Sequence, residues 1–222
     1  MKTALPLGTL YERLLDRYGP QRWWPGDSPL EIAVGAILTQ NTNWSNVEKA
    51  IANLKQAGLL DARRLQESDG EGLAETIRPS GFYRVKARRL KAFIDFLAGR
   101  YGGSMERMGR EDEQVLRERL LAIHGIGEET ADSILLYALG KPVFVIDAYT
   151  RRVLSRHGMA GERDSYSDLQ TLFHREMERD TAIYNEFHAL FVRVGKECCR
   201  PRRLCESCPL KEVEKCRRVY EL

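Results

Sequence analysis

The sequence has no cysteine before residue 198 and no long apolar run, and both absences narrow what it can encode. All five cysteines lie between Cys198 and Cys216, which is a poor layout for a disulfide framework spread over a whole fold. No stretch approaches the roughly 18 to 20 apolar residues of a membrane span, and the N-terminus lacks the pattern of a secretory signal. We therefore expect a cytoplasmic protein without a membrane partner, whose clustered thiols bind a metal.

Alternating strand patterns, low-complexity tracts and internal repeats are absent as well. Apolar residues recur instead at spacings of three and four, and 222 residues, 43% of them hydrophobic, suffice for a buried core. The sequence thus predicts an all-α protein. Capping boxes at Ser28–Glu31 and Ser45–Glu48 should each begin a helix, and the second helix should end near Gly58. Further helices are expected over residues 82–101, 112–123, 129–139, 148–157, 167–178 and 181–197.

Positive charge is concentrated in two segments, although the net charge is only +3. Residues 84–91 hold five Lys or Arg and no acid, and residues 200–218 hold seven Lys or Arg against three Glu. Such local excess suits a polyanionic partner, and it is equally typical of a solvated helix face.

Paired glycines flank one apolar residue at an expected helix start, in the segment IHGIGEET (residues 123–130). Gly125 and Gly127 allow close backbone approach. The N–H groups at the start of the following helix can then hold a phosphate oxygen without reading base sequence. An ordinary tight turn between two helices is the alternative interpretation.

A single carboxylate, Asp147, follows the apolar run VFVI (residues 143–146), twenty residues after Gly127. By itself Asp147 can be an N-cap, worth about 1 kcal/mol. Together, the hairpin and the aspartate resemble the helix-hairpin-helix (HhH-GPD) DNA glycosylases of the endonuclease III superfamily. The resemblance implies that Gly125, Gly127 and Thr130 contact the DNA backbone. It also implies that Asp147 is the catalytic carboxylate, acting on a damaged base flipped out of the duplex.

Position 129 bears on the kind of glycosylase. Members of the family that also cut the strand carry a Lys two residues after the second hairpin glycine, where this chain has Glu129. A carboxylate cannot form an imine with the sugar, so a monofunctional enzyme without lyase activity is expected. Lys141 lies beyond that helix and is not an evident substitute.

Three N-terminal segments are similar to the bacterial 3-methyladenine DNA glycosylase III branch: RWWP (22–25), AILTQNTNW (36–44) and RPSGFY (78–83). That branch also has an acid at the place of Glu129. The resemblance implies that a flipped alkylated purine lies in an aromatic pocket, whose rings favour its positive charge by about 0.5 to 2 kcal/mol. The implied pocket residues are Trp23, Trp24, Pro25, Trp44 and Glu129. Core packing is the alternative for each Trp.

Two more side chains match family positions that enter the duplex. Gln40 corresponds to the residue that fills the gap left by the flipped base, and Phe82 to the one that wedges into the opposite strand. Either side chain can instead belong to a buried loop.

The cysteines supply four thiolates, which suits a 4Fe–4S cluster, with zinc as the alternative. The expected ligands are Cys199 (or Cys198), Cys205, Cys208 and Cys216. Helix register favours Cys199 over Cys198 as the first ligand. The gap of seven residues before Cys216 departs from the five of the endonuclease III pattern. We expect a structural cluster that ties down a basic loop.

These features together predict two helical lobes with a DNA cleft between them. A six-helix barrel lobe with the hairpin should span residues 27–138, and residues 1–26 with 139–222 should form the lobe that carries the aspartate and the cluster. The expected function is monofunctional excision of alkylated purines such as 3-methyladenine, by a nucleoid-associated monomer. An endonuclease III-like glycosylase for oxidised or mismatched pyrimidines, with or without lyase activity, is one alternative. A non-catalytic DNA-binding module is another.

Overall fold

The computed structural model describes residues 6–21, 23, 26–161, 163–202 and 204–211, and these residues form helices and no strands. The chain divides into two compact units. Trp24–Lys141 is called the hairpin unit, and Met1–Trp23 with Pro142–Leu222 is called the aspartate unit. The sequence had suggested boundaries at residues 27 and 138. No helix in the described ranges is both long and apolar enough to span a membrane.

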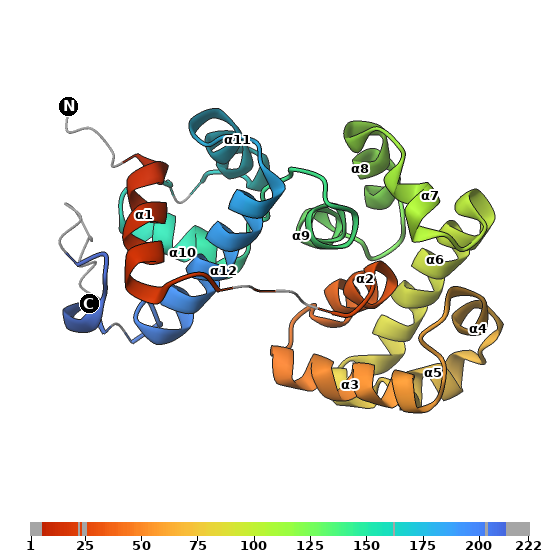
Figure 1. Ribbon diagram of the computed structural model, residues 1–222. Helices are drawn as coiled ribbons and strands as arrows, with labels where there is room; N and C mark the ends of the chain where they lie inside the picture. The colour runs from red at the N-terminus through yellow and green to blue at the C-terminus, as the bar shows by residue number, and fades with distance from the viewer. Residues whose placement is uncertain (1–5, 22, 24–25, 162, 203, 212–222) are drawn as a thin grey trace. The chain divides into compact units, whose positions relative to one another are not determined.

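The hairpin unit holds most of the helices (Figure 1). They are α2 (Pro29–Leu38), α3 (Trp44–Gln56), α4 (Ala62–Glu67), α5 (Gly70–Thr76), the 3-10 turn η1 (Arg78–Ser80), α6 (Tyr83–Tyr101), α7 (Met105–Gly109), α8 (Glu113–Leu121), α9 (Glu128–Ser133) and the π-helical turn η2 (Ile134–Ala138).

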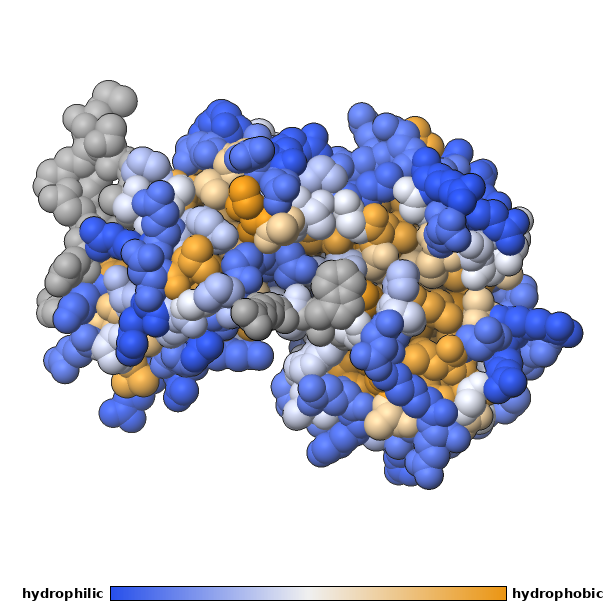
Figure 2. Space-filling model, viewed as in Figure 1, coloured by the Kyte–Doolittle hydropathy of each residue, from blue (hydrophilic) through white to orange (hydrophobic). Residues whose placement is uncertain are grey.

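Helix α2 is the centre of the hairpin unit, because α3, α6, α9 and η2 all pack against it. Most of its residues are buried, and Ile32, Val34 and Ile37 are at most 1% exposed. In the face of this unit shown in Figure 2, apolar side chains are visible over α2 and the adjoining part of α6, with hydrophilic side chains around them. The all-α prediction is confirmed, and the hydrophobic effect of this shared core holds the short helices in place.

The aspartate unit contains α1 (Leu7–Tyr18), α10 (Ala148–Arg156), α11 (Tyr166–Glu176), α12 (Thr181–Glu197) and the 3-10 turn η3 (Cys205–Ser207). Four fully buried Phe side chains form its core, with the rings of Phe144 and Phe173 stacked at 3.6 Å and those of Phe187 and Phe191 at 4.6 Å. Helices α1 and α10 both pack on α12. A Cβ on Gly195 would lie only 2.9 Å from the Cβ of Tyr149, so glycine lets α10 and α12 approach closely there.

Two helix starts test the capping predictions. Ser28 caps α2 as expected, accepting from the Glu31 N–H at 3.2 Å, with Pro29 in the first helical position. The predicted cap at Ser45 is wrong, because α3 begins at Trp44 and Asn43 is its N-cap. The Ser45 hydroxyl donates to the Asn43 side chain at 2.7 Å, so the earlier Asn takes the capping role.

Candidate active site and nucleic-acid interface

The hairpin consists of α8, a turn and α9, which runs directly into η2. Gly125 has φ of +85°, and a Cβ there would collide with the side chain of Arg89. Gly127 is the N-cap of α9 at φ −94° and is exposed, and a Cβ there would meet no neighbouring atom within 4 Å. Gly125 is thus required by the fold, whereas the structure around Gly127 would admit a side chain at the start of α9.

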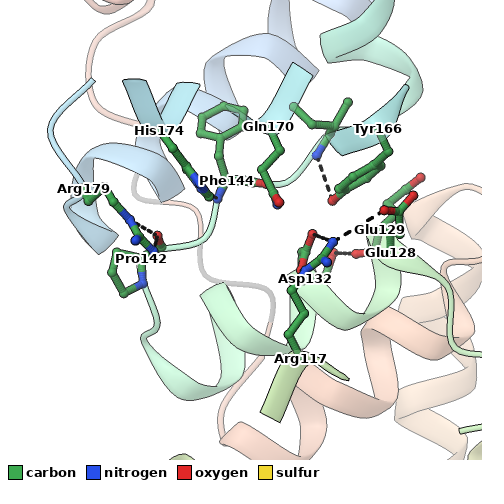
Figure 3. Close-up of polar contacts among 12 residues, drawn as sticks. Arg117, Glu128, Glu129, Asp132, Pro142, Phe144, Tyr166, Gln170, His174 and Arg179 are labelled. Atoms are coloured by element: carbon green, nitrogen blue, oxygen red, sulfur yellow. Dashed lines mark hydrogen bonds and ion pairs between the residues drawn. The ribbon is translucent and has the colours of Figure 1, made fainter. Parts of the chain in front are cut away.

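An ion pair with a buried carboxylate joins the two hairpin helices (Figure 3). Arg117 on α8 donates from Nε to Asp132 Oδ1 at 2.7 Å and from Nη2 to Oδ2 at 3.1 Å. Asp132 on α9 is fully buried, and Glu128 lies 3.7 Å from the same guanidinium. A bidentate pair of this kind is among the strong hydrogen-bonded contacts in proteins, so it links α8 firmly to α9.

Gln40 lies against the hairpin. Its Nε2 donates to the Gly125 carbonyl and to Thr130 Oγ1, both at 3.0 Å, and its Oε1 accepts from Arg89. The structure therefore brings Gln40, Gly125 and Thr130 together, as the predicted interface requires. Insertion of Gln40 into DNA would exchange these hydrogen bonds, each worth about 0.5 to 1.5 kcal/mol net, for contacts with the duplex.

Phe82 is 68% exposed and lies directly before α6, with φ of +45°. Left-handed backbone costs a residue with a side chain roughly 1 to 2 kcal/mol, so the turn is strained. An exposed aromatic ring on a strained turn is available to a partner, which is the arrangement expected of a wedge.

Most basic side chains of the segment 84–91 are engaged within the hairpin unit, whereas their charge alone had suggested a polyanionic partner. Lys86 is buried, Arg89 is bound to Gln40, and Lys91 donates to three backbone carbonyls at the end of α4. Arg84 pairs with Glu71 on the surface, and Arg88 is exposed. Most of this charge therefore serves the fold of the hairpin unit, which a count of charges along the sequence could not show.

Glu129, at the position of the family's lyase lysine, is exposed in the first turn of α9. Lys141 is engaged elsewhere, with its Nζ donating to the Glu111 carbonyl at 2.8 Å. Trp44, a predicted pocket residue, is the first residue of α3, where its ring packs 3.4 Å from the position of a Cβ on Gly35 and borders a hollow of about 290 Å³. Trp24 and Pro25 lie outside the described residues.

In the aspartate unit, Asp147 follows the buried run Val143–Ile146 and is the N-cap of α10. Its Oδ1 accepts from the Thr150 N–H at 2.7 Å, so the capping role is real. Its Oδ2 lies 3.6 Å from His188 Nε2, and the side chain is 12% exposed. One carboxylate oxygen is thus fixed by the helix and the other faces a ring, which orients the group.

His188 is the residue that the sequence interpretation missed. It lies on α12, is 4% exposed, and stacks on Trp23 with ring centroids 5.6 Å apart. Burial lowers the pKa of His188, and the charge of Asp147 only partly opposes the shift. A neutral imidazole therefore stands beside the carboxylate. The apolar neighbours of His188 on α12 resemble those of an ordinary core histidine, so no sequence signal distinguished it.

The described cysteines gather at the end of α12 and around η3. Cys199 Sγ accepts from Arg156 Nη1 at 3.2 Å, whereas Cys198 is buried and its Sγ lies 3.8 Å from both the Ser207 carbonyl and the Tyr18 hydroxyl. Burial, and then the other three described cysteines, raise the pKa of Cys208 to about 12.

Within the described ranges no three Cys, His, Asp or Glu side chains are placed to hold a metal ion, and Cys216 lies outside these ranges. The thiols are nevertheless close enough to act on one another electrostatically. A bound metal would deprotonate such thiols. The chemistry of the described thiols therefore fits a thiolate-ligated group.

The helical fold, the hairpin around Gly125 and Gly127, and Asp147 after its apolar run define a helix-hairpin-helix protein with an apolar-flanked aspartate. The family model described as "HhH-GPD superfamily base excision DNA repair protein" matches residues 34–179. A Methanocaldococcus jannaschii protein with the provisional name of a DNA repair glycosylase is 48% identical over 205 residues, covering 91% of this chain and 93% of that protein. The chain belongs to the HhH-GPD superfamily of base excision DNA repair proteins.

Further relatives and solved structures are DNA repair enzymes of similar sequence or fold. Endonuclease III of Sulfolobus acidocaldarius is 28% identical over 181 residues, covering 81% of this chain and 78% of that protein. The crystal structure of H. pylori 3-methyladenine DNA glycosylase bound to 1,N6-ethenoadenine has a TM-score of 0.77 and 32% identity, and covers 86% of this chain and 98% of that one. A trapped endonuclease III–DNA intermediate has a TM-score of 0.82 at 21% identity, covering 96% of each chain, and shows the shared fold. The chain is accordingly a DNA glycosylase, not a non-catalytic binding module.

Proposed function

We propose that the chain is a monofunctional glycosylase that hydrolyses the N-glycosidic bond of alkylated purines such as 3-methyladenine. Glu129 carries this proposal, because the position of the lyase nucleophile holds a carboxylate and Lys141, the next lysine along the chain, is bound to the Glu111 carbonyl. The H. pylori enzyme, whose structure holds a modified adenine, supports the substrate class.

Asp147 is the proposed catalytic residue. As the glycosidic bond breaks, positive charge develops on the sugar, and an ionised carboxylate held nearby stabilises it and can orient the attacking water. The hydrogen bond from Thr150 fixes the direction of the carboxylate, and neutral His188 leaves its negative charge intact.

The remaining predicted residues have the roles that the resemblance implies. Gly125, Gly127 and Thr130 hold the DNA backbone, while Gln40 and Phe82 enter the duplex of a flipped base. The resemblance assigns Trp23, Trp24, Pro25, Trp44 and Glu129 to the base pocket. Cys199, Cys205, Cys208 and Cys216 would hold a 4Fe–4S cluster, which supplies a structural tie for the loop that follows α12.

An endonuclease III-like activity on oxidised or mismatched pyrimidines is the second candidate, favoured by the cysteine loop and by relatives named endonuclease III. The two functions differ in product. A monofunctional enzyme leaves an abasic site in an intact strand, whereas a lyase forms an imine with the sugar and nicks the strand.

The test is base release from methylated duplex DNA and, in parallel, from duplex DNA with one thymine glycol. Released bases are identified by chromatography, and strand breaks are counted before and after alkali. Borohydride is added to trap any imine. We expect 3-methyladenine release, breaks only after alkali, and no trapped adduct. Thymine glycol release with direct nicking and trapping would contradict the proposal and establish the second candidate.

A further inference from the structure

A buried ammonium group lies at the centre of the hairpin unit. Lys86 on α6 is 1% exposed, and its Nζ donates to the Leu38 carbonyl at 2.8 Å and to the Ser80 carbonyl at 2.6 Å. Burial, and then the charge of Arg89, lower the pKa of Lys86 to about 8. Burying an ammonium here therefore costs folding free energy, which its hydrogen bonds must offset.

Both carbonyls lie just before a residue proposed to enter DNA. Leu38 is the last residue of α2, two positions before Gln40, and Ser80 is the last residue of η1, two positions before Phe82. The first carbonyl belongs to a helix end, where carbonyls lack partners within the helix. One side chain thus joins the starts of two loops that are distant in sequence.

Strained backbone follows each anchored carbonyl. Asn41, beside Gln40, has φ of +52°, and Phe82 has φ of +45°. Residues with side chains keep such conformations only when the surrounding structure enforces them. The ammonium of Lys86 supplies that constraint at the start of both turns.

Arg89, one turn further along α6, ties the same region to the hairpin. Its Nη1 donates to Gln40 Oε1, and its stem packs across Gly125. Gln40 in turn donates to the Gly125 carbonyl and to Thr130 Oγ1. The Gln40 loop is therefore held from one side by Lys86 and from the other by Arg89 and the hairpin.

We propose that Lys86 and Arg89 are positioning residues, which assemble the Gln40 loop, the Phe82 turn and the hairpin into one surface that recognises the gap left by a flipped base. The inference rests on the proposed roles of Gln40 and Phe82. Neither cation touches DNA in this account. Each acts through the backbone or the amide that it holds.

Lys91 offers a matched control on the same helix. Its Nζ donates to the carbonyls of Leu65, Gln66 and Ser68 at 3.1, 2.6 and 3.0 Å. It thus performs the same kind of carbonyl capping as Lys86, but at the end of α4, where no predicted DNA contact follows. Lys91→Met and Lys86→Met remove the same chemical group, and only the second removes it from the proposed recognition surface.

The experiment measures the affinity of each variant for two duplexes by fluorescence anisotropy. One duplex contains a tetrahydrofuran abasic analogue, which presents a gap, and the other is undamaged. We expect Lys86→Met to lower the ratio of the two affinities about tenfold, because two carbonyls lose their partner and both loops relax. Lys86→Arg should restore part of the ratio, since it retains charge and donors, and Arg89→Met should lower the ratio less than Lys86→Met. Lys91→Met should leave the ratio unchanged.

Thermal unfolding separates positioning from stability, and all affinities are measured well below the midpoint of the least stable variant. If Lys86→Met and Lys91→Met change the ratio equally, or if Lys86→Met lowers only the midpoint, the inference is wrong. A wild-type protein that binds both duplexes equally would also overturn it. The ratio does not depend on which base is excised, so failure of 3-methyladenine release would refute the proposed function and leave this test intact.

Discussion

The hairpin unit and the aspartate unit hold their proposed functional residues by different physical means. In the hairpin unit, Lys86, Arg89 and Arg117 donate to carbonyls, an amide and a buried carboxylate. In the aspartate unit, Asp147 is fixed by a backbone N–H and faces His188, a histidine with a lowered pKa that is packed among aromatic rings. The first arrangement is sensitive to loss of a single charge. The second is sensitive to packing and to acid.

The largest effect on stability is expected from the buried pair in the hairpin. Asp132→Asn removes the buried carboxylate that accepts two hydrogen bonds from Arg117, while Glu128 remains 3.7 Å from the guanidinium. Breaking such a pair should cost about 3 kcal/mol of the free energy of unfolding. Denaturant unfolding measures the loss. Glu67→Gln, which removes the exposed Arg63–Glu67 pair, is the control and should have no measurable effect. Equal losses in the two variants would contradict the assigned role of Asp132.

The two hairpin glycines should respond in opposite ways. Gly125→Ala introduces a Cβ at φ +85° that meets Arg89, and we expect a loss of about 1 to 3 kcal/mol in stability. Gly127→Ala has space for its methyl group, so stability should change little while affinity for duplex DNA falls. Unfolding and DNA titration are measured on both variants. Unchanged affinity in Gly127→Ala would remove Gly127 from the DNA interface.

The aspartate unit should lose stability in acid through His188. Its folded pKa lies below that of the unfolded chain, so the unfolded state binds more protons as pH falls through about 6.5, and folding weakens there. His157, also buried with a lowered pKa, adds a contribution of the same sign. The difference in stability between about pH 7.5 and pH 5.5 should shrink in His188→Gln and shrink further in the double variant with His157→Gln. If the double variant were as acid-sensitive as the wild type, other titrating groups would be responsible for the loss of stability in acid.

The smallest effect concerns the cysteine loop. Arg156 donates to Cys199 Sγ and to the Arg200 carbonyl, so Arg156→Met should loosen the loop and lower the unfolding free energy by about 1 kcal/mol. Iron and inorganic sulfide are assayed in the purified wild-type protein and in this variant. Both should be present in the wild type and be lost more readily to a chelator from the variant. Zinc without inorganic sulfide would contradict the 4Fe–4S proposal and indicate a zinc site.

The sequence predicted the helical class and most long helices, because apolar spacing and caps such as Ser28 are local signals. Gly58 does lie just past the end of α3, with φ of +65°. Helices α1, α4, α5 and α7 were missed. Helices α4, α5 and α7 have five to seven residues and show too few apolar positions to define a period. Helix α1 has 12 residues, but it follows Pro6 without a side-chain cap that would mark its start. Asn43 displaced Ser45 because both residues can cap a helix and only the structure shows which one does.

The candidate site was only partly accessible from sequence. Motif resemblance located Asp147, Gln40, Phe82 and the hairpin, because these residues occur in recognisable local segments. Lys86 and Arg89 were interpreted as part of a basic face, since a charge count cannot tell a buried ammonium from a solvated one. His188 reaches Asp147 from a helix that begins more than thirty residues later in the chain.

The most direct test of the account is single-turnover release of 3-methyladenine by the wild-type protein and by Asp147→Asn, with affinity for the abasic-analogue duplex measured on both. The variant keeps the shape of the side chain and can still accept from the Thr150 N–H, but it lacks the charge that stabilises the breaking bond. We predict a loss of roughly a thousandfold in release rate, about 4 kcal/mol, with the affinity unchanged. Release at the wild-type rate by Asp147→Asn would contradict the account.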